Sequence, residues 1–134
     1  MNKLFFSFIF SLFLFGFDSS YWAITQQYEL KKDEPLRLTL TKGEQKEQFV
    51  YLWTLFMEKE LVNKVWYKRG FYTFSLSSRY KRDIYRLELF DREIGEREDA
   101  YMLIRFVEFN PKTYTAKLEF LIHNEIEDIA ITKE

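Results

Sequence analysis

Few residues in this chain could carry out chemistry, and the missing residue types limit it most. The 134 residues include no cysteine and a single histidine, His123. Thiol nucleophiles, cysteine-ligated metals and multi-histidine metal sites within one chain are therefore excluded. A serine hydrolase would need framing such as G-x-S-x-G, which the sequence lacks. His123 falls on the polar side of an alternating segment, which indicates a surface histidine, and we expect neither a metal nor a cofactor.

A basic segment from Lys68 to Arg92 is the strongest candidate for a binding site. Its seven cations outnumber its three acids, and tyrosines lie between them. Cations beside aromatic rings can bind phosphate, polysaccharide or an acidic protein surface. The alternative is a solvent-exposed hairpin loop whose charges keep edge strands from aggregating. The predicted binding residues are Arg79, Tyr80, Lys81, Arg82 and Arg86.

The carboxylates and the overall charge point to no defined activity. Asp and Glu number 21, so pairs of them are common, and a glycosidase-like hydrolase would need two to converge in a cleft. The formal net charge of -1 argues against a general nucleic-acid binder, which would be strongly basic. A small hydrolase that uses carboxylates remains an alternative hypothesis.

The first segment of the chain has the pattern of an export signal. After Lys3, an apolar stretch runs from Leu4 to Phe17, which is shorter than the roughly 20 residues of a spanning helix. We expect residues 1–20 to be a signal peptide, with an uncleaved N-terminal anchor as the alternative, and residues 21–134 to form a single β-domain. Without cysteine, lipid attachment at a lipobox is excluded, and the expected location is periplasmic or secreted.

Alternation of apolar and polar residues recurs along the rest of the chain, and it predicts half-buried antiparallel strands. It is clearest in "PLRLTLTK", "YTFSLS", "YRLELF" and "YTAKLEFLIH", while "AYMLIRFVEF" is apolar on both faces and is typical of a central strand. Turn residues separate these runs, as in Lys42-Gly43-Glu44, Arg69-Gly70 and Asn110-Pro111. The predicted fold is all-β, a small antiparallel β-sandwich or open barrel of about seven or eight strands.

The segment from residue 47 to 61 fits a helix or a strand. Phe49, Leu52, Trp53 and Phe56 have helical spacing, whereas Phe49, Tyr51, Trp53, Leu55 and Met57 would share one face of a strand. Periodicity does not separate the two, but aromatic and branched residues favour the strand. We expect a buried strand from Phe49 to Met57, and a helix there would make the domain α+β.

These observations predict a non-catalytic β-domain that is exported and binds an unidentified protein or another component of the bacterial cell envelope, or assists assembly there. We expect no nucleic-acid partner, and contact with a membrane only through the N-terminal segment if it is uncleaved. A small outer-membrane barrel is a further alternative, although most expected strands are shorter than the about 9–11 residues of a membrane-spanning strand.

Overall fold

The computed structural model describes residues 22–79, 82–90, 100–123 and 129–134, and their secondary structure is strand joined by turns and loops. The all-β prediction is confirmed, with nine strands in these residues where about seven or eight were expected. The strands are β1 (Trp22–Lys31), β2 (Leu36–Lys42), β3 (Gln45–Met57), β4 (Glu60–Tyr67), β5 (Gly70–Ser77), β6 (Ile84–Glu88), β7 (Tyr101–Asn110), β8 (Thr115–His123) and β9 (Ile129–Lys133).

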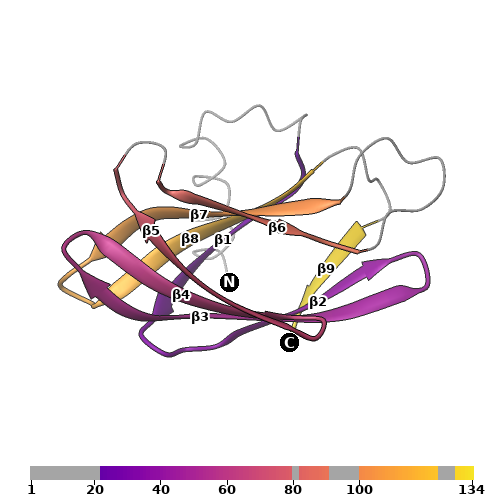
Figure 1. Cartoon of the computed structure of the whole chain (residues 1–134), viewed down its shortest axis with the longest axis horizontal. Helices are drawn as coiled ribbons and strands as arrows, with labels where there is room; N and C mark the ends of the chain where they lie inside the picture. The colour runs from indigo at the N-terminus through magenta and orange to yellow at the C-terminus, as the bar shows by residue number, and fades with distance from the viewer. Residues whose placement is uncertain (1–21, 80–81, 91–99, 124–128) are drawn as a thin grey trace, which may run out of the picture.

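The strands form two antiparallel sheets that pack face to face as a small β-sandwich (Figure 1). One sheet has the order β1-β8-β7-β6, and the other has the order β5-β4-β3-β2-β9. The chain changes sheets between β1 and β2, between β5 and β6, and between β8 and β9. Hairpins join β2 to β3, β3 to β4, and β4 to β5 within the five-stranded sheet.

The core lies between the sheets and is built from the inward side of each alternating strand. Leu36, Leu38 and Leu40 of β2 are fully buried, as their alternation with Arg37 and Thr39 predicts. Aromatic rings fill the centre, where the Phe120 ring of β8 meets Phe49 and Tyr51 of β3 at centroid distances of 6.0 and 5.5 Å. Such edge-to-face pairs add to the stabilisation that burial alone provides.

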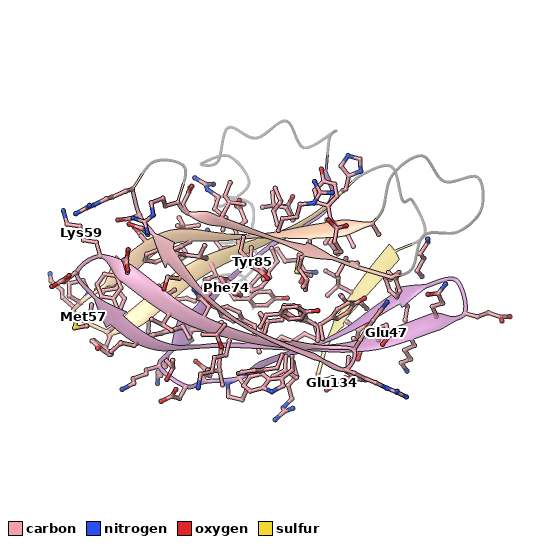
Figure 2. All side chains as sticks on the ribbon, in the orientation of Figure 1. Glu47, Met57, Lys59, Phe74, Tyr85 and Glu134 are labelled. Carbon is pink, nitrogen blue, oxygen red and sulfur yellow. The ribbon has the colours of Figure 1, made fainter. Side chains whose placement is uncertain are left out.

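One aromatic stack joins the two sheets at their facing edges. The rings of Phe74 in β5 and Tyr85 in β6 lie nearly parallel, with centroids 3.8 Å apart and an interplanar angle of 8°. Figure 2 shows these two side chains meeting between the layers. The stack therefore holds the edge of one sheet to the edge of the other.

The segment from Phe49 to Met57 is a strand, and the helical alternative is wrong. Phe49, Tyr51 and Trp53 are fully buried, as expected. The pairing of β3 with β4 shifts register between Trp53 and Leu55, which is the sign of a β-bulge. Beyond it the inward side changes, so Phe56 packs on the core while Leu55 and Met57 are exposed. The expectation that these last two residues share the buried face is corrected by the bulge.

Candidate functional site

The predicted basic loop connects β5 to β6, and it is not a hairpin, because these two strands belong to different sheets. Backbone hydrogen bonds close it, with the Ser77 N–H donating to the Arg82 carbonyl at 2.9 Å and the Arg82 N–H to the Arg79 carbonyl at 3.2 Å. Arg79 and Arg82 are exposed. Tyr80 and Lys81 lie outside the described residues, so their predicted role in binding stays a prediction.

Two of the predicted cations are held by nearby groups. The Arg82 guanidinium lies 3.2 Å from the Glu60 carboxylate, across the gap between the loop and β4. Arg86 of β6 donates from Nε to the Glu88 carboxylate at 2.9 Å, and its guanidinium carbon lies 3.9 Å from the centroid of the Tyr101 ring. These partners offset part of the positive charge that an acidic ligand would meet.

A second candidate surface, which sequence reasoning missed, lies on the β4–β5 hairpin. Trp66 and Phe71 are directly opposite one another, one residue pair before the turn. Their side chains are 40% and 54% exposed, with ring centroids 4.9 Å apart and planes inclined by 43°. Lys68 and Arg69 form the turn between them, and both are exposed. We refer to Trp66, Lys68, Arg69 and Phe71 as the aromatic hairpin.

Tyr67, which lies between Trp66 and Lys68, fixes the aromatic hairpin to the core. Tyr67 points inward and is buried, and its hydroxyl accepts a hydrogen bond from the Phe90 N–H at 3.0 Å. Tyr67 pairs with Gly70, so the turn has two residues, and Lys68 has the positive φ of 53° that such tight turns use. The exposed rings therefore stand on a well-anchored support.

Sequence alternation could have located these rings. In "LVNKVWYK", the inward positions are Leu61, Asn63, Val65 and Tyr67, whereas Lys64 and Trp66 share the opposite side. Aromatic content alone predicts that the whole segment is core, which is right for Phe49, Tyr51, Trp53 and Tyr67 and wrong for Trp66 and Phe71. The lysine two residues before Trp66 is the signal that this side of the strand faces solvent.

The outward side of the five-stranded sheet around the hairpin is basic. Val50 pairs with Trp66, and Arg37 pairs with Val50, so one row runs from Arg37 across to Phe71. Lys64 lies in the next row, opposite Thr73. The outward positions of β2 to β5 include one acid, Glu60, which lies at the end of β4 away from the hairpin and pairs with Arg82. The register and the sequence give the other outward positions: Arg37, Thr39, Thr41; Lys46, Gln48, Val50, Leu52, Leu55, Met57; Val62, Lys64, Trp66; Phe71, Thr73, Ser75.

A buried carboxylate is the main ionisable group of the other sheet. Glu119 of β8 is fully buried, and Arg105 donates from Nη1 to its Oε1 at 3.3 Å and from Nε to Asp83 Oδ2 at 3.5 Å. Burial raises the pKa of the Glu119 carboxyl above its ordinary value of 4.5, and the Arg105 charge lowers that pKa in part. The arginine stands between the two carboxylates, so they do not converge as a hydrolytic pair would.

His123 is buried rather than at the surface. It ends β8, an inner strand of the four-stranded sheet, and its ring lies 4.8 Å from the Tyr101 ring on the neighbouring strand β7. Both faces of β8 are covered here, which alternation alone did not indicate. Within the residues that the structure describes, no group of three His, Cys, Asp or Glu side chains could hold a metal ion.

Comparison with protein-family models, with curated proteins and with solved structures finds no match to this chain. In the described part of the chain, no helix has the length and apolar character needed to cross a membrane.

Proposed function

We propose that this protein is an exported, non-catalytic β-domain that binds a component of the cell envelope through its aromatic hairpin. The observation that carries the proposal is the exposure of Trp66 and Phe71 side by side on an anchored hairpin. Exposed large aromatics are costly to hydrate, and Trp is among the residues that dominate binding energy where partners meet. A rigid support lowers the entropy lost on binding, because the rings are already in place.

The sequence of the first segment supports the location. Residues 1–20 have the charge, apolar core and length of a secretory signal, and we propose a periplasmic or secreted domain. The basic loop of Arg79, Lys81 and Arg82 remains a second surface that could contribute to binding. Of its described residues, Arg79 and Arg82 lie on the connection between the sheets, and Arg82 pairs with Glu60 of β4.

A carboxylate hydrolase is the second candidate function, and one observation favours it. Glu119 combines burial with a raised pKa, as catalytic acids often do. Its contact with Arg105 is also what a structural ion pair would make. The binding function therefore explains more of the described surface, where two large rings are exposed.

Cell fractionation tests export, and co-sedimentation with washed envelopes tests binding. We expect the mature N-terminus near residue 21 and a bound fraction that falls at least about tenfold in Trp66→Ala/Phe71→Ala, because both anchors are lost. Leu55→Ala/Met57→Ala is the matched control, since it removes two exposed apolar side chains from the β3–β4 end. Equal binding by all three proteins would contradict the proposed function.

A further inference from the structure

We infer that the aromatic hairpin docks on an anionic phospholipid surface, with Trp66 and Phe71 at the headgroup level and Lys68 and Arg69 against lipid phosphates. This inference rests on the proposed function and names the chemistry of the envelope component. It also departs from the expectation that only the N-terminal segment would contact a membrane.

The first argument is the arrangement of side chains at the turn. Aromatic rings prefer the boundary between water and lipid, and lysine and arginine extend past them toward phosphate groups. The β4–β5 hairpin places one ring on each strand and two cations between them. In Figure 1 this turn lies in the lower half of the view, at the end of β4 and β5 in the five-stranded sheet.

The second argument is charge complementarity. Arg37 and Lys64 lie on the same outward side as the rings, and the one outward acid of β2 to β5, Glu60, lies at the other end of β4 and pairs with Arg82. The acidic C-terminal residue, Glu134, follows β9, which is at the opposite edge of the sheet from β5. With strands about 4.8 Å apart, three intervening strands separate that edge from β5. Glu134 accepts a hydrogen bond from Thr39 of β2 at 3.1 Å, so both acids on this side lie away from the turn where Lys68 and Arg69 are exposed.

The geometry disfavours two other partners. A saccharide ring that stacked on both aromatics would need their faces nearly coplanar, but the planes are inclined by 43°. A stable protein interface buries about 800 Å² on each partner. Two aromatic side chains supply at most about 300–500 Å² of that area. Around the rings, Val50 and Leu52 are apolar and half-buried, while Arg37, Lys64 and Thr73 are polar. A lipid surface needs only a few inserted rings and several cations.

The experiment measures quenching of tryptophan fluorescence by vesicles that contain brominated lipid. The full chain carries Trp22→Phe, because Trp22 lies five residues after the apolar stretch ends at Phe17 and would report the contact of that stretch with lipid. Of the remaining two tryptophans, Trp53 is fully buried and Trp66 is exposed. We expect quenching by vesicles of phosphatidylglycerol but not of phosphatidylcholine, and its loss on a further Trp66→Phe substitution.

Charge reversal provides the matched comparison. Lys68→Glu/Arg69→Glu should weaken binding to phosphatidylglycerol vesicles at least about tenfold. Lys59→Glu/Lys112→Glu makes the same change of charge at two other exposed turns and should leave binding within about twofold. Rising salt should weaken the wild-type interaction, because screening shortens the reach of the charges.

Three results would overturn the inference. They are equal quenching by both lipids, quenching that the hairpin charge reversal does not alter, and binding to soluble polygalacturonate without any quenching by vesicles. Co-sedimentation with envelopes tests the proposed function separately from the lipid inference. If Trp66→Ala/Phe71→Ala loses envelope binding while vesicles fail to quench, the proposed function stands and the lipid inference falls. If envelope binding is also unaffected, both fall.

Discussion

At the scale of single residues, the aromatic side chains divide into those that hold the sandwich together and those that face solvent. Trp53 heads the first group, as the largest fully buried side chain in the described residues. Its indole Nε1 donates to the Leu30 carbonyl at 2.8 Å, and its ring meets Phe109 edge to face at 5.9 Å. Trp66, only thirteen residues later in the chain, heads the second group.

Trp53→Ala should lower the free energy of unfolding by about 3–5 kcal/mol, because it leaves a large cavity and an unpaired buried carbonyl. The measurement is the chemical denaturation midpoint, with its slope checked for a change in two-state behaviour. Trp66→Ala is the control, and its effect should stay within about 1 kcal/mol since that ring is half in solvent. Similar losses in the two variants would contradict the assignment of one ring to the core and the other to the surface.

Composition alone did not separate these two groups. Phe49, Tyr51 and Trp53 alternate with residues that could also be buried, so the pattern predicts their inward direction only if the segment is a strand. Trp66 and Phe71 are just as apolar, but no described strand packs on the outward side of the five-stranded sheet. The sandwich has two layers, and hydrophobicity of a residue does not reveal which side of its strand receives the second layer.

At the scale of elements, the β4–β5 hairpin depends on one buried hydroxyl. Tyr67 accepts the Phe90 N–H from the segment that follows β6, so the hairpin is tied to a chain segment beyond the other sheet's edge strand. The turns at Gly43, Gly70 and Pro111 were predicted from the sequence, because glycine or proline marks them. Hydrogen bonds between a hairpin and a distant segment, such as that of Tyr67 with Phe90, were not predicted, because they depend on which strands become neighbours.

Tyr67→Phe should reduce stability by about 1–3 kcal/mol, because the buried Phe90 N–H loses its acceptor while the ring itself remains. Thermal or chemical denaturation gives the difference, and hydrogen exchange of the Phe90 amide should accelerate. Tyr72→Phe removes a hydroxyl from a partly exposed ring of the same hairpin, and we expect a change within about 0.5 kcal/mol. An unchanged Phe90 amide in Tyr67→Phe would show that this hydrogen bond contributes little.

The bulge in β3 is a feature that alternation of apolar and polar residues does not predict. Strict alternation assigns Leu55 and Met57 to the same side as Trp53, and one register shift moves them to the solvent side. Phe56 takes the inward place and stacks on Phe109 of β7 at 3.9 Å. Nothing in the local sequence specifies the shift, because it is set by the fit of β3 against β4 and against the rings of the opposite sheet.

At the scale of the whole molecule, polar groups cross the four-stranded sheet from edge to edge. Gln27 of β1 lies opposite Glu119 of β8, Glu119 pairs with Arg105 of β7, and Arg105 reaches Asp83 just before β6. The second carboxylate oxygen of Glu119 and the amide nitrogen of Gln27 are buried without a hydrogen-bond partner in the described part of the chain. The charged form of Glu119 is therefore only partly compensated by the protein around it.

This predicts a specific dependence of stability on pH. The pKa of Glu119 in the folded protein is raised, mainly by burial. Below about pH 4.5 the carboxyl is therefore protonated in both the folded and the unfolded state, and it does not lower the free energy of unfolding. As pH rises from there through the folded pKa, the unfolded chain loses this proton first, and the free energy of unfolding decreases. Glu119→Gln removes that contribution, so its stability relative to wild type should increase with pH across this range and then level off.

Denaturation midpoints of wild type and Glu119→Gln, measured between pH 4 and pH 8, test this dependence. Glu108→Gln is the matched control, because it removes one carboxylate from an exposed ion pair with Lys117 on the neighbouring strand. We expect the Glu119→Gln advantage to grow with pH while the effect of Glu108→Gln stays small, since exposed pairs contribute about 0–1 kcal/mol. If the advantage of Glu119→Gln shrinks as pH rises, the pairing with Arg105 outweighs the cost of burial, and the carboxylate stabilises the sheet in its charged form.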